Sequence, residues 1–248
     1  MHQNSSCEQY SSLYQETYRV RLVENGCEAL SESVLGAAEN TKTLSELIEV
    51  WAKIGLECGD SAASEELRNG DENHAGLMEL PLKDMMKSMA LEKACKEWGG
   101  SSEGFTRLLE RLYQTADVRE KRLIILVLPL LRSGERFLRV ATEAARTNIL
   151  PVFSALALGN PFPQEHFSES QWNQMVLKAI FVGCNIREIV GLHERHNSSL
   201  SETIFQYVSE RHSARRSVPP SVVELCERAL SDASQLQLNS IKPGLSQE

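Results

Sequence analysis

Polar side chains interrupt the apolar helical patterns in the C-terminal half of the chain, and their types could serve binding or catalysis. When residues 168–182 are plotted as a helix at about 100° per residue, Asn173 falls among aliphatic side chains that include Ile180. A carboxamide buried there without a partner would cost about 1–3 kcal/mol. We therefore expect Asn173 either to hydrogen-bond inside the protein or to face a lined cavity. Gln174 and Lys178 share a separate stripe of the same helix.

A second set of polar residues lies at predicted helix ends and turns. The set consists of Glu135, Arg136, Arg146, Thr147, Asn148, Asn160, His166, Tyr207, Glu210 and Arg211. Two interpretations stay open. In the first, the set lines one polar cleft, where Arg146 and Arg211 bind an anionic ligand and the side chains of Asn173 and Lys178 contact its oxygens. In the second, the same residues form ion pairs and caps between helices.

Motifs for metal or nucleotide chemistry are weak or missing. His193 and His196 are three residues apart, which one helical turn could bring together. The segment lacks the HExxH spacing of zinc hydrolases, and no third ligand is evident. The chain also contains no GxSxG, Walker or GxGxxG motif. We therefore predict no catalytic residue, no metal and no cofactor.

Composition and charge limit the classes of partner. The 248 residues include 26 Lys and Arg against 34 Asp and Glu, a net charge of −8, which argues against a nucleic-acid partner. The basic segment 211–216 is expected to end a helix and to make at most a weak contact with an anionic membrane surface.

The N-terminal residues, the longest apolar run and the cysteines indicate the cellular compartment. The first fifteen residues carry neither a basic start nor an apolar run, so we expect no signal peptide. The longest apolar run, residues 123–131, is well short of the roughly 20 residues of a membrane span. Six scattered cysteines without a CxxC pair fit reduced thiols. We therefore expect a cytoplasmic protein.

The elements that must position the polar residues are helices. Apolar residues recur at helical spacing over many segments, and no strand-like alternation with hairpin turns is found. The expected helices cover residues 43–58, 78–98, 102–112, 121–131, 137–145, 149–158, 168–182, 199–211 and 220–230. Periodicity alone leaves 121–131 open to a buried strand, but its leucines favour a helix. The fold class is therefore all-α, with stacked antiparallel helices. A HEAT-like or irregular helical repeat stays open.

The chain is expected to have three regions. Residues 1–120 form an N-terminal helical region, in which the polar and acidic segment 59–76 is a mobile insert. Residues 121–234 form a denser helical core. Residues 235–248, rich in Ser and Gln, form a flexible tail.

Five ordered blocks in the second half carry a resemblance to a known family. They read LPLLRSGERF (128–137), ARTNILPVFSALALGNPFPQEHF (145–167), WNQMVLKAIFVG (172–183), IVGLHERHNSSL (189–200) and YVSERHSARRSVP (207–219). The chain resembles the EboA family of bacterial metabolite traffic proteins over these blocks. The family's usual acidic residue before Asn160 is replaced by Gly159, so the resemblance implies no catalytic carboxylate there.

The resemblance implies a site and a biological setting. It adds Arg195 to the polar positions, so the candidate ligand-binding residues are Arg146, Asn148, Asn160, His166, Asn173, Gln174, Lys178, Arg195, Glu210 and Arg211. It implies a non-catalytic accessory protein or scaffold of secondary metabolism. The implied partners are other proteins of the same gene cluster and a small anionic or lipid-linked metabolite. The alternative is a pathway enzyme that acts on an anionic or prenylated small molecule.

Overall fold

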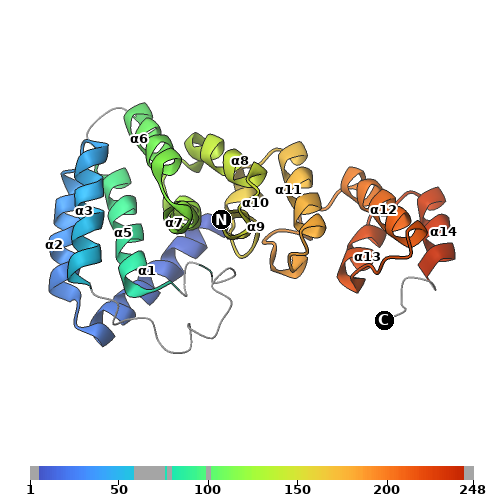
Figure 1. Cartoon of the computed structure of the whole chain (residues 1–248), viewed down its shortest axis with the longest axis horizontal. Helices are drawn as coiled ribbons and strands as arrows, with labels where there is room; N and C mark the ends of the chain where they lie inside the picture. Colours follow the sequence, from blue (N-terminus) through green and yellow to red (C-terminus); the bar gives the residue numbers. More distant parts are fainter. Residues whose placement is uncertain (1–5, 59–75, 77–79, 99–101, 243–248) are drawn as a thin grey trace, which may run out of the picture. The chain divides into compact units, whose positions relative to one another are not determined.

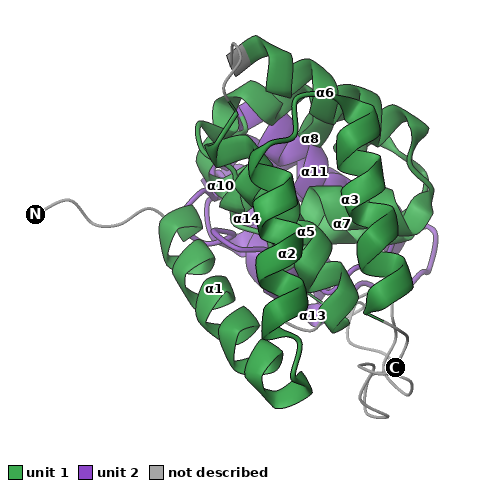
Figure 2. Cartoon of the chain, turned by 90° about the vertical axis from the view of Figure 1, so that its left-hand side faces the viewer, with its two compact units in different colours: residues 1–167 green, residues 168–248 purple. Residues whose placement is uncertain are grey.

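The structure, a computed structural model, describes residues 6–58, 76, 80–98 and 102–242. All regular secondary structure within these residues is helical, which confirms the predicted all-α class. The chain divides into two compact units, residues 1–167 and residues 168–248 (Figure 2). Each unit has its own set of buried apolar side chains.

Unit 1 is the larger of the two and holds most of the helices (Figure 1). Its α-helices are α1 (Ser6–Asn25), α2 (Glu28–Glu39), α3 (Leu44–Glu57), α5 (Leu82–Lys96), α6 (Ser102–Thr115), α7 (Val118–Val127), α8 (Leu138–Arg146), α9 (Leu150–Ala157) and α10 (Phe162–His166). The 3₁₀ segments η2 (Leu128–Leu130) and η3 (Gly134–Phe137) lie between α7 and α8.

Local signals in the sequence explain where two of these helices begin. The Thr43 hydroxyl accepts a hydrogen bond from the Glu46 N–H at the start of α3, and the Glu46 carboxylate accepts from the Thr43 N–H. Asp117 and Glu120 form the same reciprocal arrangement at the start of α7. Each capping box satisfies N–H groups that a helix leaves unpaired at its first turn.

The centre of unit 1 is α7, which packs against α5, α6, α8 and α9. Its residues from Leu123 to Val127 are all buried, and Leu128 continues the buried run into η2. A helix with apolar residues on every side is stable only inside a core. The apolar run at 121–131 is thus helical, as predicted.

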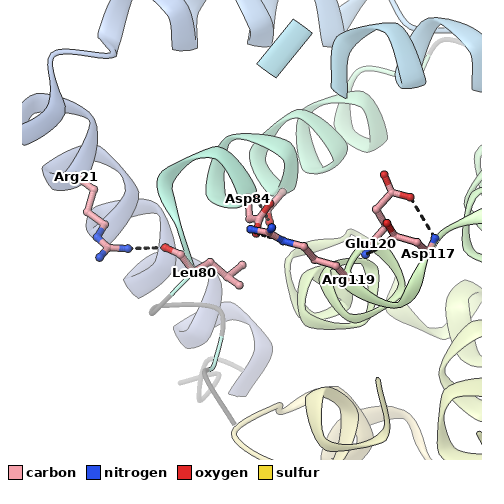
Figure 3. Close-up of polar contacts among 7 residues, drawn as sticks. Arg21, Leu80, Asp84, Asp117, Arg119 and Glu120 are labelled. Atoms are coloured by element: carbon pink, nitrogen blue, oxygen red, sulfur yellow. Dashed lines mark hydrogen bonds and ion pairs between the residues drawn. The ribbon is translucent and has the colours of Figure 1, made fainter. Parts of the chain in front are cut away.

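Two polar contacts hold other helices of unit 1 to this core (Figure 3). The carboxylate of Asp84, 6% exposed on α5, accepts hydrogen bonds from Arg119 of α7 at 2.9 and 3.2 Å. A buried carboxylate needs such a partner because its desolvation is otherwise unfavourable. Arg21 of α1 donates to the backbone carbonyl of Leu80 just before α5. The three helices are thereby cross-linked.

Unit 2 consists of α11 (Glu169–Phe181), η4 (Ile186–Glu188), α12 (Ser198–Ser213), α13 (Pro220–Glu227) and α14 (Asp232–Ile241). Its buried side chains include Trp172, Leu200, Ile204, Cys226 and Leu238. A Ser168–Gln171 capping box begins α11. Asn173 of α11 hydrogen-bonds to Asn197, the N-cap of α12. The Phe181 ring of α11 packs against the Tyr207 ring of α12. The first contact lies in the early turns of α11 and at the start of α12, and the second lies at the end of α11 and in the middle of α12.

Most helix predictions agree closely with the structure. The expected helix at 149–158 is α9, and the one at 168–182 is α11 with its two caps. The expected helix at 199–211 begins one residue earlier, at Ser198, and Ser199 does not cap it. The Asn197 side chain accepts from the Leu200 N–H instead. Glu202 accepts hydrogen bonds from Ser231 and Ser234, which ties α12 to the start of α14.

Other sequence expectations differ from the structure or fall outside the described residues. Helices α1 and α2 were not among the expected helices. Residues 235–241, expected in a flexible tail, belong to α14 because Leu238 is fully buried and Ser231 caps the helix. The expected insert at 59–76 lies outside the described residues except for Gly76. The compact units meet at 167/168. The expected regions with a boundary at 120/121 stay a prediction, as does a helical repeat.

Candidate functional site

Asn160 is the most deeply buried of the candidate residues, at 2% exposure. Its side-chain amide donates to the carbonyls of Ile125 at 3.1 Å and Ala155 at 2.9 Å, and its oxygen accepts from the Phe162 N–H at 3.0 Å. These bonds join the end of α9 to α7 and to the start of α10. A side chain engaged by three backbone groups holds helices together.

Arg146 and Asn148 lie in a different environment, at the junction of α8 and α9. Both side chains are exposed. The C-cap of α8 is Thr147, whose hydroxyl accepts from the Ile149 N–H at 3.2 Å. The structure therefore places these two residues at the surface of unit 1, within the same short turn.

His166 ends the short helix α10 and packs against two neighbours. Its ring lies 4.5 Å from the Phe162 ring, measured between centroids. Its Nε2 atom would lie only 2.4 Å from a Cβ added at Gly134, so the imidazole fits because residue 134 has no side chain. The preceding residue, Glu165, accepts a hydrogen bond from the backbone N–H of Cys7 at 2.5 Å. The sequence analysis named His166 as a candidate but did not name its neighbours Glu165 and Cys7.

In unit 2, Asn173 forms a reciprocal amide pair with Asn197. The two side chains exchange hydrogen bonds of 3.1 and 2.9 Å, and Asn197 also donates to the Arg195 carbonyl. Asn173 is half-buried rather than fully buried. Of the two alternatives drawn from the sequence, the structure supports the hydrogen bond inside the protein.

Arg195 and His196 lie directly before Asn197, on the loop that leads into α12. The Arg195 guanidinium lies 4.8 Å above the Trp172 ring, a cation–π contact. The His196 Nε2 and the Ser201 hydroxyl are 2.6 Å apart, and burial lowers the pKa of His196. Within the described part of unit 2, Nδ1 of His196 is buried without a hydrogen-bond partner.

Three remaining candidates of unit 2 belong to one surface area, here called the α11–α12 face, made of Gln174, Lys178, Phe181, Tyr207 and Arg211. Gln174 and Phe181 are exposed, and the other three side chains are half-buried. Helical spacing puts Gln174, Lys178 and Phe181 on one stripe of α11. Phe181 is 66% exposed and meets Tyr207 of α12 edge to face, with centroids 4.9 Å apart.

Two cations belong to the same face. The Arg211 guanidinium lies 5.7 Å from the Tyr207 centroid, and its Nε donates to the Ser217 carbonyl at 2.7 Å, which fixes its position. Lys178 lies one turn before Phe181 on α11, and partial burial lowers its pKa. Glu210, next to Arg211, is exposed.

The candidates thus divide between the two units. Unit 1 holds Arg146, Asn148, Asn160 and His166; unit 2 holds Asn173, Gln174, Lys178, Arg195, Glu210 and Arg211. A single cleft lined by all of them stays a prediction. Sequence reasoning missed Trp172, Phe181 and His196 as site neighbours. The signal for Phe181 was available, because it falls one turn beyond Lys178 on the same stripe.

Comparisons with known proteins give one match. The family model described as "Metabolite traffic protein EboA" matches residues 98–227, just over half of the chain. No curated protein and no solved structure matches. Among the described helices, none is both long and apolar enough to cross a bilayer.

Proposed function

Because the chain belongs to the EboA family of metabolite traffic proteins, we propose that it is a non-catalytic helical accessory protein of a secondary-metabolite pathway. In this proposal it binds a small metabolite on the α11–α12 face. The metabolite has an anionic group and an apolar or prenylated part.

The observation that carries this proposal is an exposed aromatic ring on the same face as two cations. Phe181, at 66% exposure, and Val182, at 44%, present apolar surface that water solvates poorly. Lys178, one turn before Phe181, and Arg211, over the Tyr207 ring, would attract an anionic group. A ligand with both an apolar and an anionic part would satisfy both kinds of contact, whereas a purely ionic ligand would leave the rings in water.

The state of the other polar residues favours an accessory role over catalysis. Asn160 is engaged by three backbone groups, and Asn173 is paired with Asn197. Residues held in this way maintain helix packing and are poor candidates to exchange protons with a substrate. The pathway enzyme remains our second proposal. Other proteins of the same gene cluster remain the proposed macromolecular partners.

Binding of an anionic aromatic dye, anilinonaphthalene sulfonate, to the full chain tests the proposal. We expect Phe181→Ala and Arg211→Ala each to weaken binding about fivefold, the order of one cation–π or stacking contact. Leu236→Ala and Arg187→Ala are matched controls, since they remove an exposed apolar group and an exposed guanidinium elsewhere in unit 2. A farnesyl phosphate competitor should displace the dye from the wild-type protein.

Two results would overturn the proposal. Equal weakening by the control variants would show that dye binding does not depend on this face. Conversion of the farnesyl phosphate to a product, lost in Arg211→Ala, would favour the enzyme.

A further inference from the structure

Three potential metal ligands meet where the first turn of α1 contacts α10. Cys7 lies on α1 and is buried, while Glu165 and His166 are the last two residues of α10. The thiol sulfur, one carboxylate oxygen and one imidazole nitrogen all lie within 4.8 Å of one another. In a search of the described His, Cys, Asp and Glu residues, this is the cluster of three whose ligand atoms are close enough to share an ion.

We propose that Cys7, Glu165 and His166 bind a divalent metal of borderline softness, of the class of Zn²⁺. A thiolate, an imidazole and a carboxylate are the three ligand types that Zn²⁺ takes in proteins. Ligand atoms of a tetrahedral zinc are roughly 3–4 Å apart, given bond lengths of about 2.0–2.3 Å. Small side-chain rotations would bring the three atoms from their present spacing to that distance. Three protein ligands leave a fourth position for water or another ligand.

The surroundings already orient two of the three ligands. The Phe162 ring and the close approach of Gly134 limit where the His166 imidazole can lie. Glu165 is held by the hydrogen bond from the Cys7 N–H, which also brings the carboxylate next to the sulfur. A metal ligand whose orientation is set by its neighbours loses less conformational freedom on binding.

Metal binding here would release a proton. Burial, with a further contribution from the adjacent Glu165, raises the pKa of the Cys7 thiol, so the apo protein keeps it protonated. The metal replaces that proton: the S–H bond breaks, the sulfur binds the ion and the proton goes to solvent.

A simpler role for Glu165 must be separated from this one. Its carboxylate accepts a hydrogen bond in the first turn of α1, where a helix favours negative charge, so it could merely anchor that helix. Glu165→Gln keeps an oxygen that can accept from the Cys7 N–H but removes the charge that a metal needs. This variant should keep the helix anchored and lose metal affinity.

Titration of the full chain with Co²⁺, followed by displacement with Zn²⁺, tests the proposal. The expected result is a thiolate-to-cobalt absorption band that zinc abolishes. The band should vanish in Cys7→Ser and persist in Cys95→Ser, which removes another buried thiol of unit 1. Glu165→Gln and His166→Asn should weaken cobalt binding by more than the roughly 10–100-fold that loss of an outer hydrogen-bond partner costs. Gly134→Ala should weaken it too, because the added Cβ displaces the imidazole.

Several results would overturn the inference. The first is a cobalt band that survives in folded Cys7→Ser. The second is a cobalt affinity that Glu165→Gln and His166→Asn both leave at the wild-type value. If Cys7→Ser fails to fold, Glu165→Gln decides: a folded variant with wild-type cobalt affinity means that Glu165 only anchors α1.

Discussion

Two carboxamides of the molecule, Asn160 in unit 1 and Asn173 in unit 2, both stood out in the sequence but occupy different environments. Asn160 is almost completely buried and meets three backbone groups. Asn173 is half-buried and exchanges two hydrogen bonds with one other side chain. The backbone cannot move to release Asn160 without disturbing α7, α9 and α10. The side-chain pair of Asn173 can rearrange locally, so polar residues of unit 2 are better placed to respond to a ligand.

The largest expected effect is that of Asn160→Ala. The variant leaves two buried carbonyls and one N–H without their side-chain partner, and we expect the free energy of unfolding to fall by about 3 kcal/mol. Urea unfolding followed by circular dichroism measures it. Asn148→Ala, the same change at an exposed site, should stay within about 0.5 kcal/mol of wild type. Similar losses in both variants would remove the contrast between the two environments.

A double-mutant cycle on the amide pair should give intermediate effects. Asn197→Ala loses the pair and the cap of α12, so we expect a loss of about 2 kcal/mol. Asn173→Ala loses only the pair and should cost about 1 kcal/mol. The double variant should resemble Asn197→Ala alone, because the pair is already broken there. Ser199→Ala is the matched control and should have almost no effect; simple additivity of the two asparagine variants would contradict the pairing.

The smallest expected effect is a pH dependence from His196. Burial lowers its pKa in the folded state below the ordinary value of 6.5, so the unfolded state binds the proton more tightly. The contribution of His196 to the free energy of unfolding is complete above pH 6.5 and is lost as the pH falls below that value. Urea midpoints of wild type and His196→Gln, compared at pH 7.5 and 5.5, should show the larger acid-induced loss in wild type. His193→Gln should show an acid-induced loss between those of wild type and His196→Gln, because His193 is a minor contributor to the lowered pKa of His196.

Sequence reasoning located the helices whose signals are local. The caps and periodicity of α3 and α11 lie within the helices themselves, and both were predicted to within about a residue. Helix α1 was missed because its buried positions, among them Tyr14, Tyr18 and Leu22, are spaced along an otherwise polar segment. Tertiary contacts also decided the start of α12. Both Asn197 and Ser199 could cap it, and Asn197 does so while paired with Asn173, 24 residues away.

The candidate site was predictable by residue type but not by partner. The sequence indicated that three residues are unusual, since Asn173 interrupts an apolar helical pattern while Asn160 and His166 lie at predicted helix ends or turns. It contained no signal for the distant neighbours that determine their roles. The Ile125 carbonyl is 35 residues from Asn160, and Cys7 is 158 residues from Glu165. Such pairings follow from the fold and not from spacing.

The bond between Cys7 and Glu165 bears on how the protein is synthesised. At about 5–20 residues per second, the ribosome adds the 158 residues between them in roughly 8–30 s. The Tyr14 hydroxyl meets its acceptor, the Met85 carbonyl, after only 71 residues. The nascent N-terminal helix would therefore dock from its middle first, and its opening turn would wait for the last helix of unit 1 to leave the exit tunnel. During that interval the opening turn is where chaperones and proteases have most access.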